Sequence, residues 1–262
     1  IELELNQLLK KQIKLVSYLC DAKEYQFISE ILSENNVDIV FHAAAYKHVP
    51  LVEKNPLQGI LNNFISTKVI CEASKKNQVK NMILISSDKA VRPTNVMGAT
   101  KRLTEIVVQA FSKMESNTIF SMVRFGNVLG SSGSVVPLFK KQIEAGGPIT
   151  ITNPNIERYF MTTMEATKLV IQTVKFSKGG EVFLLDMGEP IKIIDLAKQM
   201  IKLSGLSIKT NKNPDGDIEI VSTGLRTGEK LYEELLIDAK SEKTPHPLIY
   251  KGFEKTINNQ KL

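Results

Sequence analysis

Short apolar runs alternate along the chain with longer segments in which apolar residues recur every three or four positions. The short runs predict strands at residues 14–19, 37–41, 81–86, 118–124 and 181–185. The longer segments predict helices at residues 24–35, 55–75, 97–114, 135–145, 163–176 and 194–204. Because strands that alternate with helices form a parallel sheet with helices on both faces, the pattern predicts an α/β fold.

Small and polar residues follow three of the predicted strands. Residues 43–45 are all alanine, residues 86–88 read Ser-Ser-Asp, and residues 125–127 read Phe-Gly-Asn. Right-handed crossovers place the carboxyl ends of parallel strands at one edge of a sheet, where ligands of α/β proteins bind. We therefore expect these three segments to meet at a ligand site.

The pattern changes after Gly130. A serine- and glycine-rich loop precedes the helix at 135–145, and a further strand is predicted at 218–222. We assign residues 1–133 and 160–187 to the main α/β unit. Residues 134–159 and 188–262 are assigned to a smaller C-terminal α/β lobe that binds substrate.

The composition is that of a globular protein with one large domain or two interleaved ones. Of the 262 residues, 42% are hydrophobic and 24% are charged. The net charge of +6 suits an anionic ligand, although a solvated lysine-rich surface gives the same value. The basic residues are scattered and aromatics make up only 6%, which argues against a nucleic-acid partner.

The cysteines and histidines give no sign of a disulfide framework or a metal centre. Cys20 and Cys71 lie far apart without a CxxC pair, which is typical of a reducing compartment. His42, His48 and His246 lack the spacing of zinc ligands, so no metal site is predicted. No signal peptide or apolar run of membrane-spanning length is evident, so we expect a cytoplasmic location.

The segment at residues 84–101 carries the most specific motif, because a strand ending in Ser-Ser-Asp-Lys is followed by the helix start Met-Gly-Ala-Thr-Lys. It resembles the active-site strand and helix of the extended short-chain dehydrogenase/reductases. Within them it is most similar to the nucleotide-sugar 4,6-dehydratases of the capsule and polysaccharide-biosynthesis type. Most of that superfamily has Tyr-x-x-x-Lys on the helix, whereas Met97 stands here at the tyrosine position, as in one branch of these dehydratases.

The resemblance implies a Rossmann-like doubly wound sheet and a catalytic set of Ser87, Asp88, Lys89, Met97 and Lys101. In that set Lys101 binds the nicotinamide ribose, Asp88 is the acid for the leaving C6 hydroxyl, and Lys89 is the base for the C5 proton. Met97 has no ionisable proton, so Ser87, a water or Asp88 must replace the tyrosine. On the residues alone, Met97 is more typical of a core residue, and Asp88-Lys89 of a surface ion pair in a turn.

The resemblance also implies a cofactor, NAD rather than NADP. Residues 43–50 resemble the family's Ala-Ala-Ala-x-Lys-His-Val-Pro block, and residues 63–67 resemble Asn-x-x-Gly-Thr. By this resemblance the cofactor-binding residues are Asp21, Ala43, Ala44, Ala45, Lys47, Asn63, Ser86 and Lys101. Other readings of the same residues are a helix N-cap for Asp21 and a buried, hydrogen-bonded amide for Asn63.

A UDP-sugar is the substrate that the resemblance implies, together with a homo-oligomeric assembly. Residues 124–135, 158–161 and 226–231 resemble the family's nucleotide-sugar loop and its Arg-Tyr-Phe-Met and Arg-Pro-Gly-Glu-Lys-Leu blocks. Thr227 replaces the proline of the last block. The substrate-binding residues are then Asn127, Ser134, Arg158, Arg226 and Glu229. Guanidinium groups suit a diphosphate because they donate in a planar fork.

The glycine-rich loop that binds the pyrophosphate of a dinucleotide is missing from the sequence, whose glycines start at Gly59. By resemblance, residues 1–12 fall on the helix before the third Rossmann strand. The Rossmann portion would then be incomplete, and we expect this chain alone to bind NAD weakly or not at all. By the same resemblance, many full-length relatives carry membrane segments ahead of the catalytic unit, which can anchor them at the inner face of the membrane.

Three functions stay open at this point. The leading hypothesis is NAD-dependent dehydration of a UDP-N-acetylhexosamine, of the UDP-N-acetylglucosamine 4,6-dehydratase type, for surface polysaccharide or glycan biosynthesis. The second is a nucleotide-sugar 4-epimerase or a C5-inverting dehydratase. The third is an inactive truncated fragment without cofactor.

Overall fold

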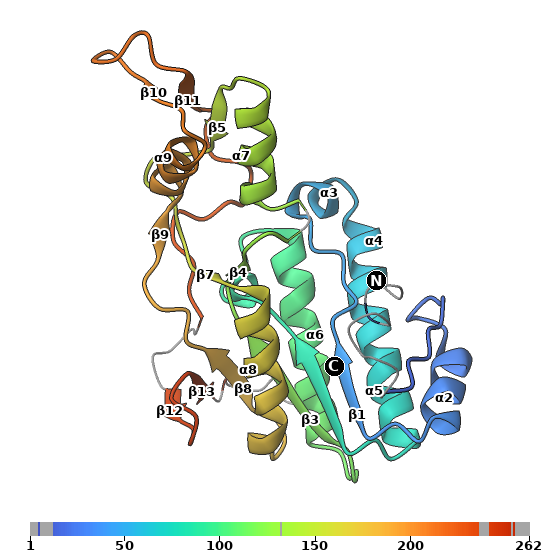
Figure 1. Cartoon of the computed structure of the whole chain (residues 1–262). Coiled ribbons are helices and arrows are strands. Elements are labelled where there is room, and N and C mark those ends of the chain that lie inside the picture. Colours follow the sequence, from blue (N-terminus) through green and yellow to red (C-terminus); the bar gives the residue numbers. More distant parts are fainter. Residues whose placement is uncertain (1–4, 6–12, 132, 236–240, 253, 255–262) are drawn as a thin grey trace.

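The computed structural model describes residues 5, 13–131, 133–235, 241–252 and 254. A large α/β unit and a smaller lobe lie one above the other in Figure 1. The prediction of a helix within residues 1–12 lies outside the described residues, apart from Leu5. No helix in the described ranges is long and apolar enough to span a membrane.

The large unit is built on a six-stranded sheet. Its strands lie in the order β1-β2-β3-β8-β13-β12 and comprise Ile39–His42, Asn81–Ile85, Ile119–Arg124, Val182–Leu185, Ile249–Gly252 and Ser241–Lys243. The first four are parallel and the last two pair antiparallel. The α/β prediction is therefore confirmed, with antiparallel strands at one edge.

Helices cover both faces of this sheet because each face is apolar. The helices α2 (Tyr25–Glu34), α5 (Ser66–Lys76) and α6 (Val96–Ser112) pack over buried residues such as Met82 and Phe120. On the opposite face α8 (Thr163–Phe176) packs over another buried cluster of the same strands. Its capping box, in which Thr162 and Glu165 bond each other's backbone N–H, fixes where α8 begins.

The helix predicted at 55–75 is interrupted. It forms α4 (Pro56–Ile60), a π-helical turn η1 (Leu61–Ile65) and α5, after the short α3 (Val49–Lys54). The π turn contains Asn63, whose buried side chain bonds the neighbouring loop. Such turns are frequent at functional sites.

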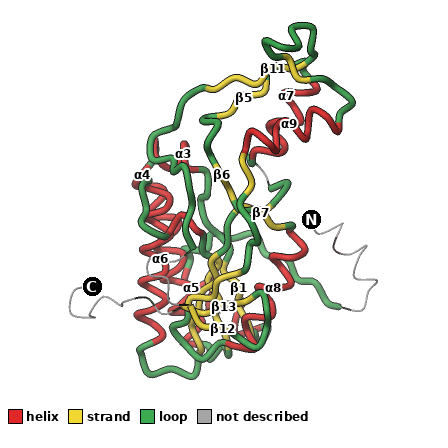
Figure 2. The backbone as a smooth tube through the Cα atoms, turned by 90° about the vertical axis from the view of Figure 1, so that its left-hand side faces the viewer, coloured by secondary structure: helices red, strands yellow, loops and turns green. Residues whose placement is uncertain are grey.

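The smaller lobe has its own core. Its helices are α7 (Val135–Glu144) and α9 (Ile193–Leu203), and its sheet comprises β10 (Ile208–Lys209), β11 (Ile218–Ser222) and β5 (Ile149–Ile151). Two short strand pairs lie between the lobe and the main sheet (Figure 1 and Figure 2): β4 (Asn127–Val128) with β7 (Phe160–Met161), and β6 (Glu157–Arg158) with β9 (Ile191–Lys192).

Two expectations differ from the structure. The strand predicted at 14–19 is wrong: these residues form no strand and are largely exposed, with Leu19 fully so. A strand needs a hydrogen-bonding neighbour, and none of the described residues pairs with this segment. The division that placed 188–262 wholly in the smaller lobe also differs, because β12 and β13 lie in the main sheet.

Candidate active site

A cleft of about 930 Å³ lies where the carboxyl edge of the main sheet faces the smaller lobe. Its lining includes most residues selected from the sequence, namely Ala43, Ala45, Lys47, Ser86, Ser87, Lys89, Met97, Lys101, Asn127, Ser134, Arg158, Arg226 and Glu229. Asp21, Ala44, Asn63 and Asp88 are not part of the lining. The predicted meeting of 43–45, 86–88 and 125–127 at one edge is thus observed.

A hydrogen-bonded chain of three side chains follows β2. The hydroxyl of Ser87 donates to Asp88 Oδ1 over 2.8 Å, and Lys89 Nζ donates to the same oxygen over 3.0 Å. The backbone N–H of Asp88 donates to the carbonyl of Phe125, which fastens this turn to the end of β3. Asp88 is fully buried, and its Oδ2 has no hydrogen-bond partner among the described residues. Asp88 therefore reaches the cleft through Ser87 and Lys89, which line it.

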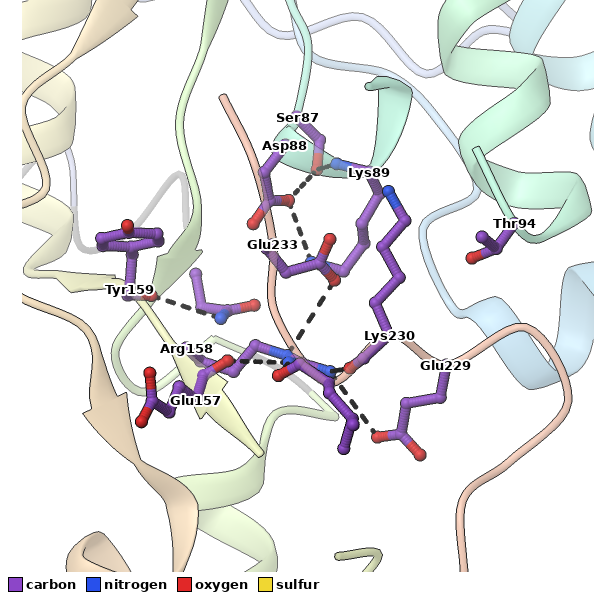
Figure 3. A network of polar contacts seen from close by, with 12 residues as sticks. Ser87, Asp88, Lys89, Thr94, Glu157, Arg158, Tyr159, Glu229, Lys230 and Glu233 are labelled. Atoms are coloured by element: carbon purple, nitrogen blue, oxygen red, sulfur yellow. Dashed lines mark hydrogen bonds and ion pairs between the residues drawn. The ribbon is translucent and has the colours of Figure 1, made fainter. Parts of the chain in front are cut away.

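Glu233 is a member of this centre that the sequence did not reveal. Its Oε1 lies 3.6 Å from Lys89 Nζ and 3.9 Å from Arg158 Nε, and Figure 3 shows it between these two cations. Burial disfavours the ammonium form of Lys89, but Asp88 and Glu233 hold the pKa of Lys89 above its ordinary value. Burial raises the pKa of Glu233 against the attraction of Lys89. No spacing in the sequence links Glu233 to residues 87–89, so only the fold could bring them together.

The start of α6 places Met97 and Lys101 in the cleft. The side chain of Asn95 accepts a 2.8 Å hydrogen bond from the N–H of Gly98 and so caps the helix. Lys101 Nζ donates to the carbonyl of Ile85 over 2.6 Å. Burial lowers the pKa of Lys101 to about 8, although Glu105 opposes this shift. An ammonium group has three donor hydrogens, so further ones remain for a ligand.

Ser86 has a structural partner. Its hydroxyl donates to Glu105 Oε1 over 2.6 Å, and the two oxygens of Glu105 also accept from the buried guanidinium of Arg124. Although burial opposes it, these bonds hold the pKa of Glu105 below its ordinary value. The ion pair ties α6 to the end of β3, and the Ser86 hydrogen bond ties α6 to the end of β2, which rigidifies the edge that carries the site.

Arg158 is engaged by the backbone of the smaller lobe. Its guanidinium donates to the carbonyls of Glu157, Lys230 and Leu231 at 2.7–3.1 Å. Glu229 in turn accepts from the hydroxyl of Thr152. Arg158 therefore holds the segment that carries Glu229 and Glu233 in place.

Other residues of the predicted substrate set are open to the cleft. Arg226 is exposed, and no hydrogen bond or ion pair of its guanidinium is found in the described part of the chain. Ser134 precedes the first residue of α7, and its buried hydroxyl has no hydrogen-bond partner among described residues. Asn127 donates to the carbonyl of Tyr159 over 3.2 Å. A helix N-terminus, a hydroxyl and a guanidinium are together suited to phosphate oxygens.

Asn63 and Asp21 have local partners. The buried amide of Asn63 bonds both backbone groups of Tyr46 and the hydroxyl of Thr100. It thus fixes the 43–48 loop beside α6. Asp21 is half exposed and pairs with Lys23 at 3.0 Å in the turn before α2.

The loop at 226–230 is fastened to the segment that precedes α6. The carbonyl of Gly228 accepts from Thr94 Oγ1 over 2.7 Å and from Asn95 Nδ2 over 3.2 Å. Lys230 Nζ donates to the carbonyl of Val91 over 2.7 Å. These bonds close one side of the cleft between the two parts of the molecule.

Comparisons with known proteins place the chain in a family. The capsular polysaccharide biosynthesis protein CapD of Staphylococcus aureus is 49% identical over 255 residues, which cover 96% of this chain and 41% of CapD. The chain thus spans about two fifths of that relative's length. A UDP-glucose 4-epimerase of Rickettsia canadensis is 36% identical over 225 residues, or 85% of this chain and 62% of the epimerase.

Among solved structures, that of Pen from Bacillus thuringiensis superposes with a TM-score of 0.82 at 35% identity, over 95% of this chain and 77% of Pen. The model of the family described as "Polysaccharide biosynthesis protein" matches residues 1–253. The resemblance to the capsule and polysaccharide-biosynthesis branch is confirmed, and the chain belongs to this polysaccharide biosynthesis protein family of extended short-chain dehydrogenase/reductases.

Proposed function

We propose that the chain takes part in NAD-dependent dehydration of a UDP-N-acetylhexosamine, of the UDP-N-acetylglucosamine 4,6-dehydratase type, for surface polysaccharide or glycan biosynthesis. The observation that carries this proposal is the hydrogen-bonded chain of Ser87, Asp88 and Lys89 at the cleft edge. Elimination of water needs one group that gives a proton and one that takes a proton, and Asp88 and Lys89 supply these two groups. The similarity to a capsular polysaccharide biosynthesis protein supports the same pathway class.

The residues around Lys101 fit the ribose and nicotinamide of NAD. Lys101 has ammonium hydrogens beyond the one bound by Ile85, and Ala43 and Ala45 line the cleft without bulky side chains. When bound, NAD would accept hydride from C4 of the sugar and return it to C6. Lys101 would hold the ribose hydroxyls and keep the local potential positive.

The Asp88–Lys89 hydrogen bond is suited to preparing the acid and the base together. Moving the shared proton from Lys89 Nζ to Asp88 Oδ1, over 3.0 Å, leaves a neutral amine and a protonated carboxyl. The amine can then take the C5 proton, and the carboxyl can protonate the departing C6 hydroxyl through Ser87 Oγ, which lines the cleft. Positioned groups of this kind contribute typically about 10²–10⁴-fold to the rate.

Ser87 is the residue that we propose in place of the usual tyrosine. Its hydroxyl lines the cleft and donates to Asp88, whereas Met97 offers no proton. A proton from the C4 hydroxyl of the sugar could pass to Ser87 Oγ as the Ser87 proton passes to a water in the cleft, so that Asp88 keeps the proton that it received from Lys89. Asp88, being buried, has no contact of its own with the cleft.

Arg226, Ser134 and Asn127 form the proposed diphosphate and sugar contacts. All three line the cleft, and Arg226 is exposed there. Arg158 donates to backbone carbonyls of residues 230 and 231. We therefore propose that Arg158 holds this segment in place and that it is not the main phosphate contact. The predicted homo-oligomer stays a prediction, which the mass of the protein in solution would test.

Mass spectrometry of the sugar nucleotide tests the proposal. The purified chain, and the complete product of its gene, are incubated with UDP-N-acetylglucosamine and NAD. Loss of one water by both supports the dehydratase and contradicts the expectation that this chain alone binds NAD weakly. Loss by the complete product alone supports the chemistry and marks this chain as insufficient by itself. No loss by either contradicts the proposal.

A 4-epimerase is the second candidate, favoured by the 36% identity to a UDP-glucose 4-epimerase. Epimerisation conserves the mass of the sugar nucleotide and inverts C4, so mass spectrometry combined with proton NMR separates the two reactions. The Asp88–Lys89 pair favours dehydration because epimerisation requires no acid for a departing hydroxyl. A C5-inverting dehydratase would lose water and also exchange the C5 proton with inverted stereochemistry.

A further inference from the structure

Glu233 and Lys89 come from different parts of the molecule. Lys89 lies in the turn after β2, whereas Glu233 follows the 226–230 loop that Arg158 and Thr152 hold against the smaller lobe. Their charged atoms approach to 3.6 Å. The side chain of Glu233 is only 4% exposed and that of Lys89 is 22% exposed. This ion pair is largely buried. It joins the turn after β2 to the segment that follows the 226–230 loop.

In the part of the chain that the structure describes, few other charges lie near Lys89. Asp88 lies at 3.0 Å and is the nearer carboxylate. Arg158 is the cation that disfavours the ammonium form of Lys89, and Glu233 lies between the two. Glu233 is also attracted by Lys230 and repelled by Asp88. Without Glu233, the described groups that affect the charge of Lys89 would be one carboxylate and one guanidinium, whose effects oppose each other.

We propose that Glu233 is a positioning residue that, together with Asp88, holds Lys89 as an ammonium ion in the cleft. Oε2 of Glu233 has no hydrogen-bond partner among the described residues, so this carboxylate is oriented by its ion pairs alone. The charge of Lys89 then depends on the position of the segment after the 226–230 loop, because this segment carries Glu233. A lysine that serves as a base must lose this proton before it acts. Glu233 therefore links the position of that segment to the fraction of Lys89 that is present as the neutral amine. This link to the reaction rests on the proposed function.

Competitive acylation measures the charge of Lys89 directly. Trace acetic anhydride reacts only with neutral amines, and acetylation of Lys89 can be quantified by peptide mass spectrometry at about pH 8, without cofactor or sugar nucleotide. The exposed Lys140, whose side chain is 73% exposed, serves as the internal reference. Removing an opposite charge within about 4–6 Å shifts a pKa by about one unit or more, and each unit is tenfold in neutral amine. Glu233→Gln should therefore raise the relative rate at Lys89 by about tenfold or more.

Glu234→Gln is the matched control, because Glu234 is the next residue, is 47% exposed and pairs with Arg92. It should leave the Lys89 rate unchanged. Glu233→Asp keeps the charge and should stay within about threefold of the wild-type rate, which tests charge separately from any loss of packing. An unchanged rate in Glu233→Gln, or an equal rise in Glu234→Gln, would overturn the inference.

The reaction is tested separately from the ion pair. If Lys89 is the base, Glu233→Gln should move the acidic limb of the kcat/KM profile for dehydration to lower pH. A Glu233-dependent acylation rate in a protein that dehydrates no UDP-sugar would contradict the proposed function and leave the ion-pair inference intact.

Discussion

The ammonium group of Lys101 donates a 2.6 Å hydrogen bond to the carbonyl oxygen of Ile85. This bond joins the first turns of α6 to the last residue of β2, next to the Ser87–Lys89 turn. Lys101 is only 7% exposed, so its charge is held in a poorly hydrated place. The protein thus keeps a cation in the cleft at a cost to its stability.

That cost predicts a pH dependence of stability. Burial lowers the pKa of Lys101 in the folded protein to about 8, from its ordinary value of 10.5, so the unfolded chain binds more protons between these pH values. The free energy of unfolding contributed by Lys101 is lowest below pH 8 and rises through this window, by on the order of 3 kcal/mol. In urea denaturation, the free energy of unfolding of the wild type should increase relative to that of Lys101→Met as the pH rises from 7.5 to 10. Lys140→Met, at an exposed lysine, should show no such trend.

Replacing Asp88 by asparagine should remove the proposed acid and keep the shape of the side chain. We expect Asp88→Asn to lower dehydration by about 100-fold or more, because a carboxamide cannot protonate a departing hydroxyl. Reduction of NAD by the sugar nucleotide, followed by absorbance, should persist, because it needs no such acid. Asp195→Asn, at an exposed carboxylate paired with Lys198, is the control and should dehydrate at the wild-type rate. Dehydration by Asp88→Asn at the wild-type rate would remove Asp88 from the mechanism.

The hydroxyl of Ser87 is predicted to matter more than its size. Ser87→Ala removes the group that joins the cleft to Asp88, and we expect kcat to fall by about 10–100-fold with little change in KM. Ser87→Thr retains the hydroxyl and should keep most of the activity. Steady-state kinetics of both variants give the comparison, and equal losses would indicate a packing role instead.

The sequence predicted elements whose causes are local. The helix predicted at 97–114 is observed as Val96–Ser112. It was predictable because the residues of the helix itself and the adjacent Asn95 determine its apolar face and its cap. The strand at 14–19 failed because a strand is stabilised by its neighbours, and the apolar alternation of this segment says nothing about whether a neighbour is present. The π-helical interruption at Leu61–Ile65 was not predicted either, since it depends on the contacts of Asn63 with the 43–48 loop, which is distant in sequence.

The candidate site was predictable to the extent that it is made of contiguous motifs. Residues 86–89, 97–101 and 226–229 each carry a recognisable pattern, and the structure brings them to one cleft. Contacts between motifs were not predictable. The pairing of Lys89 with Glu233, and the engagement of Arg158 by backbone carbonyls, depend on the packing of the smaller lobe against the sheet.

Gly228 is predicted to be required for closing the cleft. Its φ of +73° is unfavourable for other residues, and a Cβ there would lie 2.6 Å from the carbonyl oxygen of Thr94. Gly228→Ala should therefore displace the 226–230 loop and weaken the bonds of its carbonyl to Thr94 and Asn95. Because this loop carries Arg226 and Glu229, KM for the sugar nucleotide should rise by about tenfold, which corresponds to about 1.4 kcal/mol of binding.

Gly224 provides a control that separates steric displacement from backbone strain. Its φ is +87°, but a Cβ there would have no heavy atom within 4 Å. Gly224→Ala should thus cost about 1–2 kcal/mol of stability from its left-handed conformation and leave KM near the wild-type value. Thermal unfolding and steady-state kinetics of both variants decide the question. Equal increases in KM would mean that backbone strain near the 226–230 loop suffices, and that the contact of Gly228 with Thr94 has no special part in positioning Arg226.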